Sequence, residues 1–179
     1  MPLRNTADAW GLVSRAIHWL MFALIGAQIV VGLLLEDLPK GSALRGFAFD
    51  AHETAGVVAL LLVFARLAWR ASNPAPEAQG SDLVRRLAAY GHAALYALMI
   101  AIPVAGMAMV DLKGHQVAFF AWEFPDLLPK NEALARGLAE AHETLAWALV
   151  LLVAGHVAAA LWHHVALKDR TLARMLGRA

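Results

Sequence analysis

Long uninterrupted apolar runs dominate the pattern of hydrophobic and polar positions along the chain. No formal charge occurs in the 20 residues of 16–35, the 24 residues of 87–110 or the 24 residues of 144–167. A hydrocarbon core of ~30 Å needs a helix of about 20 apolar residues. The pattern therefore predicts transmembrane helices at about 14–35, 87–110 and 141–166.

A fourth apolar segment, at about 51–70, carries one internal charge, Arg66. None of the four segments alternates as a barrel strand would, so each must satisfy its backbone hydrogen bonds as a helix. We predict an all-α fold, an integral membrane four-helix bundle that forms a single domain over residues 1–179. The connection between the third and fourth helices is long, and its aromatic cluster is expected on the membrane surface: Phe119, Phe120, Trp122 and Phe124.

Composition narrows the possible functions further. Hydrophobic residues make up 60% of the chain, charged residues 16%, and the net charge is +1. A basic nucleic-acid-binding protein is thereby excluded, and a bilayer protein is favoured. The chain has no cysteine, which excludes disulfides, iron–sulfur clusters, thiolate zinc sites and covalently attached c-type haem.

The basic residues predict the orientation. Ten of the 15 lysines and arginines fall on the side of the two termini and the connection between the second and third helices, and five fall on the other side. By the positive-inside rule, both termini are expected in the cytoplasm of a multi-pass protein.

The tetrapeptide Ala-His-Glu-Thr occurs twice, at residues 51–54 and 141–144. When the two copies are aligned, the residue 14 positions after His52 is Arg66, and the residue 14 positions after His142 is His156. Fourteen residues make about 3.9 helical turns, so each pair shares a helix face and is separated by about 21 Å. His142 is therefore expected near the outer surface and His156 deep toward the cytoplasm.

The remaining topology places His52 at the outer level and His18 at the level of His156. Imidazoles are the usual axial ligands of b-type haem, and two layers of paired histidines suit two haems stacked across the membrane. Several alternatives stay open. A histidine can be a packing residue, zinc can compete although it prefers four ligands at one depth, His92 can replace His18, and a methionine can be a ligand. The candidate methionines are Met99, Met107 and Met109.

Four segments together resemble the bacterial cytochrome b561 family: SRAIHWL, AHETAG, GHAALYALMIAIPVAG and AHETLAWALVLLVAGHVAAALWHH. The last is also similar to the haem b subunits of membrane formate dehydrogenases and nickel–iron hydrogenases. The resemblance covers nearly the whole chain. It implies a quinone-reactive protein of the bacterial inner membrane with two haem b groups. It also implies that His18 and His156 bind the cytoplasmic haem iron, and His52 and His142 the periplasmic one.

The resemblance implies an oxidoreductase that takes electrons from superoxide at the periplasmic face and reduces ubiquinone near the cytoplasmic haem. No catalytic residue beyond the haems is expected. The outer side is acidic overall, so attraction of superoxide would need a local basic patch. The candidates for this patch are Lys40, Arg45, Lys113, His115 and Lys130. Two other functions stay open: a membrane subunit that relays electrons between a periplasmic redox partner and the quinone pool, and a haem-free helical bundle.

Further residues receive expected roles. Arg66 would pair with a haem propionate, or else extend to the interface. His92, His163 and His164 are candidates for the quinone site or its proton path. Glu53 and Glu143 are expected in first turns of their helices, where they complement the helix dipole. Small residues such as Gly26 and Gly32 are expected to make room for the macrocycles, and Pro103 with Gly106 to kink the third helix.

Overall fold

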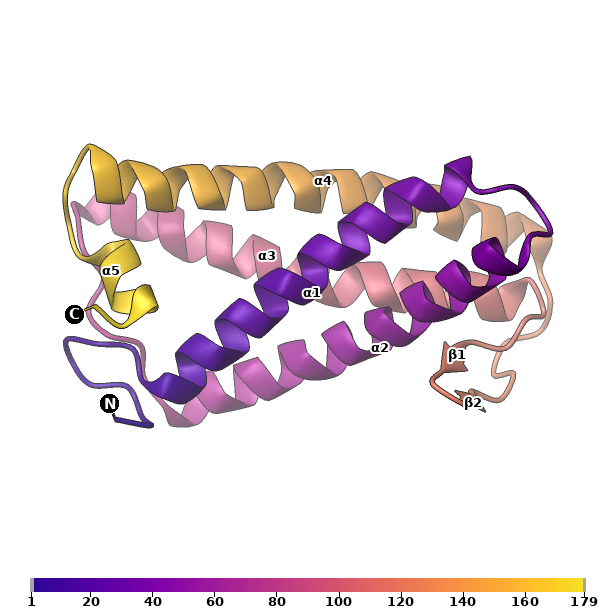
Figure 1. The fold of residues 1–179 in the computed structure, drawn as a ribbon, viewed down its shortest axis with the longest axis horizontal. Coiled ribbons are helices and arrows are strands. Elements are labelled where there is room, and N and C mark those ends of the chain that lie inside the picture. The colour runs from indigo at the N-terminus through magenta and orange to yellow at the C-terminus, as the bar shows by residue number, and fades with distance from the viewer. Residues whose placement is uncertain (1, 179) are drawn as a thin grey trace.

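The computed structural model describes residues 2–178 and confirms the all-α class. Within that range, four helices are long and apolar enough to cross a membrane. A short helix and a two-stranded hairpin complete the structure (Figure 1). In chain order the elements are α1 (Leu12–Asp37), α2 (Ala43–Ser72), α3 (Asp82–Leu112), β1 (Ala118–Phe119), β2 (Trp122–Glu123), α4 (Glu132–Val165) and α5 (Thr171–Leu176).

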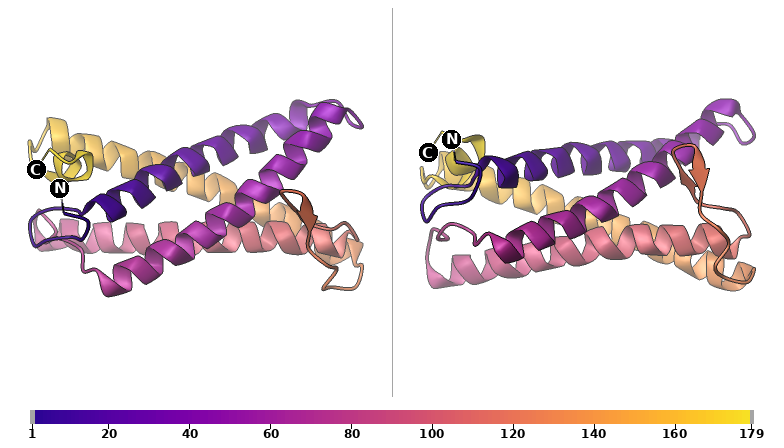
Figure 2. Two further views of the ribbon diagram at one scale, coloured as in Figure 1. Left: turned by 60° about the horizontal axis from the view of Figure 1, so that its bottom comes forward. Right: turned by 90° about the horizontal axis from the view of Figure 1, so that it is seen from below.

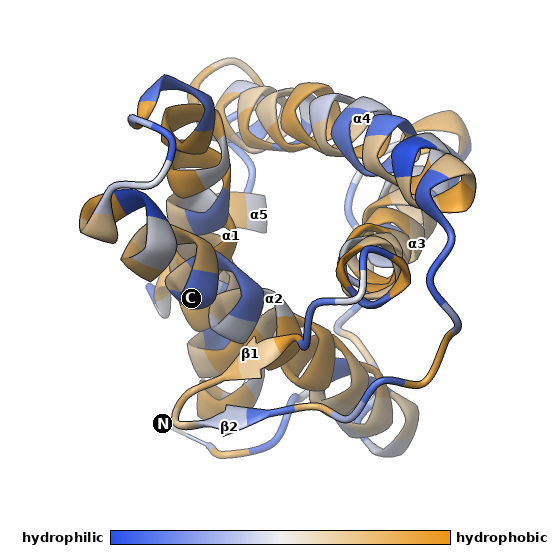
Figure 3. Cartoon of the chain, turned by 90° about the vertical axis from the view of Figure 1, so that its right-hand side faces the viewer, coloured by the Kyte–Doolittle hydropathy of each residue, from blue (hydrophilic) through white to orange (hydrophobic). Residues whose placement is uncertain are grey.

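The outer surface of the bundle is apolar. Large hydrophobic side chains such as Leu33, Phe64 and Leu151 are exposed, Leu151 to 73%. Seen from the hairpin end, hydrophobic residues cover much of the four long helices, whereas hydrophilic residues gather at the near ends of helices and in parts of the connecting segments (Figure 3). An exposed apolar surface this extensive is unfavourable in water and fits a lipid environment. Four long apolar helices with such a surface are those of a multi-pass membrane protein.

Helices that follow each other in the chain lie side by side and run in alternating directions. α1 contacts α2, α2 contacts α3, and α3 contacts α4 (Figures 1 and 2). The N-terminal segment and α5 lie at one end of the bundle, which we call the termini end. The β-hairpin lies at the other, which we call the hairpin end.

Two helices begin well before the apolar segments that predicted them. α2 begins at Ala43, because the Ser42 hydroxyl accepts a hydrogen bond from the backbone N–H of Arg45. α4 begins at Glu132, because the Asn131 side chain accepts one from the backbone N–H of Leu134. Counting uncharged residues finds the part of a helix inside a bilayer and misses its polar extension.

The expectation that Glu53 and Glu143 lie in first turns is therefore wrong. Both residues follow two or more turns of helix. Glu143 is exposed, whereas the Glu53 carboxylate accepts a hydrogen bond of 2.8 Å from the backbone N–H of Ala118 in the hairpin. The neighbouring Thr54 hydroxyl accepts one of 3.1 Å from the backbone N–H of Phe120.

The hairpin itself was not expected from the sequence. Ala118 pairs with Glu123 and Phe119 with Trp122, and Phe120 adopts a positive φ of 56° at the turn. The rings of Phe119 and Phe120 are 5.0 Å apart, while Phe120 and Trp122 are exposed to 71% and 78%. The aromatic cluster therefore forms a protruding apolar surface at the hairpin end.

One buried arginine joins the segments at the termini end. Arg174, in α5, is only 8% exposed. Its guanidinium donates hydrogen bonds to the backbone carbonyls of Asp8, at 2.5 Å, and Glu77, at 2.8 Å. The N-terminal segment, the connection between α2 and α3, and α5 are thus held together by one side chain. A charged group with several carbonyl acceptors contributes more than an ordinary hydrogen bond.

We expect Arg174→Ala to lower the free energy of local opening at the termini end by about 3 kcal/mol, because buried carbonyls lose a charged donor. Hydrogen–deuterium exchange of the detergent-solubilised protein measures this opening at residues 2–11 and 73–81. Arg178→Ala, which removes an exposed arginine of the same segment, is the control. Unchanged protection in Arg174→Ala would contradict the structural role.

Candidate functional site

Two of the predicted site residues, His18 of α1 and His156 of α4, face each other in the half of the bundle nearest the termini end. Their ring centroids are 6.3 Å apart, and the rings are tilted by 59°. The sequence predicted that His18 and His156 lie at the same depth of the bilayer, and the positions of the two rings agree with that prediction.

The other two predicted residues, His52 of α2 and His142 of α4, form the same arrangement toward the hairpin end. Their ring centroids are 6.2 Å apart, and the rings are close to perpendicular at 71°. The Nδ1 of His142 lies 2.9 Å from the backbone carbonyl of Ile102. A carbonyl only accepts, so Nδ1 carries the proton and the lone pair of Nε2 is free for a metal.

Small residues leave room for these imidazoles. A Cβ atom added at Gly106 would lie 3.1 Å from Cε1 and 3.2 Å from Nδ1 of His142. A Cβ atom added at Gly32 would lie 3.5 Å from Cε1 of His52. The helix α3 continues through Pro103, although a proline cannot donate the helical hydrogen bond. Gly106 therefore makes room for a ring, a more specific role than the expected kink.

The spacing of both pairs fits a six-coordinate haem iron. Two imidazole nitrogens that bind one metal from opposite sides at about 2.0 Å place their ring centroids about 6.2 Å apart, because each centroid lies about 1.1 Å behind its nitrogen. Both observed separations, 6.3 and 6.2 Å, agree with this value. Within residues 2–178, no group of three or more His, Asp or Glu could hold a metal ion.

His92 also approaches His156, but at a different distance. Their ring centroids are 5.4 Å apart, which is shorter than two imidazoles on one iron require. The spacing therefore favours His18 over His92 as the partner of His156. His92 and His156 line a cavity between the four long helices, together with Gly26 and Met99. The empty volume of this cavity is about 660 Å³.

Arg66 lies at the wall of this cavity and contacts His18 directly. Its Nη2 is 3.1 Å from Nδ1 of His18, and its Nε donates to the Tyr96 hydroxyl at 3.0 Å. A guanidinium only donates, so Nδ1 of His18 accepts, and the proton of a neutral ring is on Nε2. A metal at Nε2 therefore requires this tautomer to change and Arg66 to release the ring.

Beyond the cavity, His163 pairs with a residue that the sequence did not single out. The Nδ1 of His163 lies 2.5 Å from the carboxylate of Asp169, whereas His164 is exposed. Burial acts to raise the pKa of Asp169, but hydrogen bonds from His163 and Thr171 outweigh it and hold the pKa below its usual value. Seven residues separate His163 from His156, so both lie on one face of α4. The short segment between α4 and α5 brings the two partners together, and no spacing rule predicts that.

The basic residues at the hairpin end are only partly brought together. Arg45 donates hydrogen bonds to the carbonyls of Leu35 and Leu38 at the end of α1. The side chain of Lys130 crosses Gly114, between Lys113 and His115 in the chain, since a Cβ there would overlap it. Lys40 is exposed in the separate connection between α1 and α2. The basic patch therefore reduces to Lys113, His115 and Lys130, and Arg45 has a structural role.

Four membrane-spanning helices with histidines paired at two depths define a membrane cytochrome b type of bundle. The sequence model of the prokaryotic cytochrome b561 family matches residues 9–178. The chain is 32% identical to "Cytochrome b561 homolog 2" of Escherichia coli (strain K12), over 100% of this chain and 97% of that protein.

Two further relatives agree. "Cytochrome b561 homolog 1" of Escherichia coli (strain K12) is 29% identical over 90% of this chain and 93% of its own length. "Probable superoxide oxidase CybB" of Yersinia pestis is 32% identical over 89% of this chain and 91% of its own length. The chain belongs to the prokaryotic cytochrome b561 family, which implies haem b binding and electron transfer across the membrane.

We expect Gly106→Val to reduce the amount of haem that the purified protein binds. A branched side chain at this position displaces the imidazole of His142 and breaks its hydrogen bond to the Ile102 carbonyl. The haem content per chain, measured after extraction into pyridine, checks the effect. The control is Gly91→Val in the same helix, where an added Cβ meets no atom of the described residues within 4 Å. Equal haem content in both variants would contradict the packing argument.

Proposed function

We propose that the protein binds two haem b groups, one between His18 and His156 and the other between His52 and His142. The supporting observation is that both pairs, on different helices and at two depths, have the ring spacing of two imidazoles on one iron. With haem bound, His18 would hold the iron, and the Arg66 guanidinium, no longer bonded to Nδ1, would be the partner of a haem propionate.

Bound haem would supply one-electron carriers at two depths of the bilayer. The reaction we propose transfers electrons from superoxide to ubiquinone. Two superoxide anions give up one electron each and become dioxygen, and one ubiquinone takes up two electrons and two protons to become ubiquinol. The hairpin end faces the periplasm, and the termini end, with most of the basic residues, faces the cytoplasm.

The donor assignment rests on two observations. A relative with 32% identity is named a probable superoxide oxidase. At the hairpin end, Lys113, His115 and Lys130 form a local basic patch that can attract an anion to an otherwise acidic side. The patch is small, so attraction is expected only over a short range at physiological salt.

The acceptor side lies at the termini end. His92 lines the cavity beside His156, and His163 with Asp169 lies two turns further along the same face of α4. An imidazole paired with a carboxylate can pass protons from the cytoplasm toward a reduced quinone. His164, which is exposed, is suited to collecting those protons from water.

A second function is favoured by the hairpin. Phe120 and Trp122 protrude at the hairpin end and are largely exposed, and Glu53 and Thr54 hold the hairpin directly beside His52. A periplasmic redox protein that docked on this surface would lie next to the pair formed by His52 and His142. In that case the chain is a subunit that relays electrons between such a partner and the quinone pool.

We expect His142→Ala to lower the haem content from about two to about one per chain, because one of two axial ligands of the hairpin-end haem is lost. His156→Ala should remove the other haem instead. Haem extraction gives the content, and reductive titration followed by visible absorbance distinguishes which haem remains. Full haem content in either variant would show that the proposed pairing is wrong.

Superoxide as the electron donor is tested with the purified protein in detergent, in the presence of ubiquinone and an enzymatic source of superoxide. We expect rapid reduction of the haem absorbance bands, about one ubiquinol for each two superoxide anions consumed, and abolition of both by superoxide dismutase. Haems that ignore superoxide but are reduced by added ubiquinol would exclude the oxidase. That result would favour the relay subunit, whose partner could then be isolated by crosslinking to residue 122.

A further inference from the structure

The two histidines of the hairpin-end pair differ in what the Nδ1 atom of each ring contacts. The Nδ1 of His142 lies 2.9 Å from the backbone carbonyl of Ile102. The Nδ1 of His52 is buried, and within residues 2–178 it has no hydrogen-bond partner. The two rings are therefore not equivalent, although they face each other across one gap.

The polar side chains near His52 are bonded elsewhere. Gln28 of α1 donates from Nε2 to the backbone carbonyl of His52 at 2.9 Å, and this acceptor fixes which end of the amide is the nitrogen. The Glu53 carboxylate and the Thr54 hydroxyl accept from backbone N–H groups of the hairpin. One turn after Gln28, α1 presents Gly32 to the ring, where an added Cβ would lie 3.5 Å from Cε1 of His52. Glycine has no side-chain acceptor, so this wall offers the ring none.

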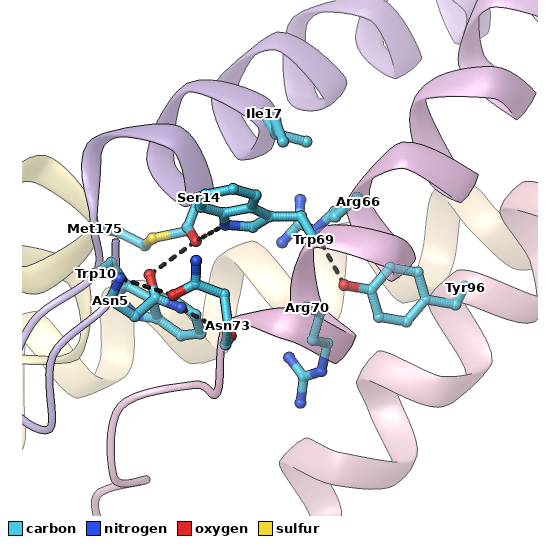
Figure 4. Close-up of a pocket in the computed structure, with 10 residues that line it drawn as sticks. All are labelled: Asn5, Trp10, Ser14, Ile17, Arg66, Trp69, Arg70, Asn73, Tyr96 and Met175. Atoms are coloured by element: carbon cyan, nitrogen blue, oxygen red, sulfur yellow. Dashed lines mark hydrogen bonds between the residues drawn. The ribbon is translucent and has the colours of Figure 1, made fainter. Parts of the chain in front are cut away.

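The pair at the termini end shows a different arrangement. Nδ1 of His18 has a partner, because Arg66 Nη2 lies 3.1 Å from it. The Nε of Arg66 donates to the Tyr96 hydroxyl at 3.0 Å, which holds the guanidinium in place (Figure 4). Among the four paired histidines of residues 2–178, a buried Nδ1 without a partner is therefore particular to His52. Such buried polar atoms are uncommon in native proteins and require an explanation.

The difference matters because of where an imidazole carries its proton. A neutral ring has one proton, so Nδ1 must carry it when Nε2 binds a metal. For His142 this N–H has an acceptor in the Ile102 carbonyl, and such an acceptor raises the basicity of the metal-binding nitrogen. For His52 the same N–H would be a buried donor without an acceptor, which is unfavourable.

We propose that His142 and His52 would be unequal axial ligands of the hairpin-end haem, with His142 the stronger and His52 the weaker. Ile102 and Gly32 act through these rings as positioning residues: Ile102 supplies an acceptor to one ring, and Gly32 withholds one from the other. An acceptor at Nδ1 makes the imidazole a better donor to ferric iron, so withholding it raises the reduction potential and favours electron uptake at this end. The inference rests on the proposed function for the presence of haem at this pair.

Removal of each ligand in turn tests the inequality. We expect His52→Ala to keep about half or more of the hairpin-end haem, bound through His142 alone, whereas His142→Ala loses it. The expected difference in haem affinity is about tenfold or more, since the loss of a partner that holds a ligand costs about 10- to 100-fold in metal affinity. Haem extraction gives the content, and visible absorbance shows the high-spin spectrum of iron with one imidazole. Equal loss in the two variants would overturn the proposal.

A second pair of variants leaves both ligands in place. Gly32→Ser brings a hydroxyl beside the His52 ring, and this hydroxyl can donate to the helical carbonyl of Gln28 and accept from Nδ1–H. Gly32→Ala is the matched control, because its Cβ fits in ordinary contact with the ring and brings no acceptor.

We expect Gly32→Ser to raise the ferric-to-ferrous ratio of the hairpin-end haem about tenfold at a fixed potential, which corresponds to a midpoint lower by about 59 mV for one electron. Gly32→Ala should change this ratio by less than about twofold, because it adds no hydrogen bond. A redox titration followed by visible absorbance measures both midpoints. Equal midpoints in the two variants would overturn the role of Gly32 and, with it, the proposal.

The outcomes also separate this inference from the proposed function. If His52→Ala and His142→Ala both keep two haems per chain, the pairing itself is wrong. If both variants lose the hairpin-end haem alike, the pairing stands and the two ligands are equal. Haem content and midpoint are measured without superoxide or quinone, so neither result depends on the electron donor or acceptor.

Discussion

Two imidazoles on different helices face each other at nearly the same distance in both halves of the bundle, and the packing around them keeps this distance. The separations of 6.3 and 6.2 Å fit one metal ion between two nitrogens. Close helix packing would close both gaps. Gly32 and Gly106 keep neighbouring helices near the rings without filling that space, and the Ile102 carbonyl fixes one ring in the tautomer that leaves Nε2 free.

The repeated tetrapeptide shows how identical residues acquire different roles from their surroundings. Both histidines face the same gap. Glu53 and Thr54 bind the backbone of the hairpin, whereas Thr144 donates to the carbonyl of Glu140 in its own helix, and Glu143 is exposed. The hairpin lies beside α2, so only the first copy of the tetrapeptide contacts it. The histidine is thus the shared element, and the residues that follow it serve local structure.

The sequence was sufficient for features that depend on one helix at a time. Uncharged length predicted three of the four long helices, and an apolar run with one internal charge predicted the fourth. The 14-residue spacing predicted that His142 and His156 share a face at two depths. Features that need contacts between distant segments were not predictable. The hairpin depends on Glu53, 65 positions away from Ala118. The partner of His163 depends on the turn before α5, and the burial of Arg174 depends on two loops that converge on it. Pattern and periodicity carry no information about such convergence.

Arg66 is the charge beside the proposed inner haem site. It lies within an apolar helix, and such charges are retained where they have partners. Its partners are His18 and Tyr96, and all three residues line the histidine cavity. Binding of iron by His18 would free one arm of the guanidinium, which would then be available to a propionate. Arg66 would thereby have a partner inside the bundle both with and without haem.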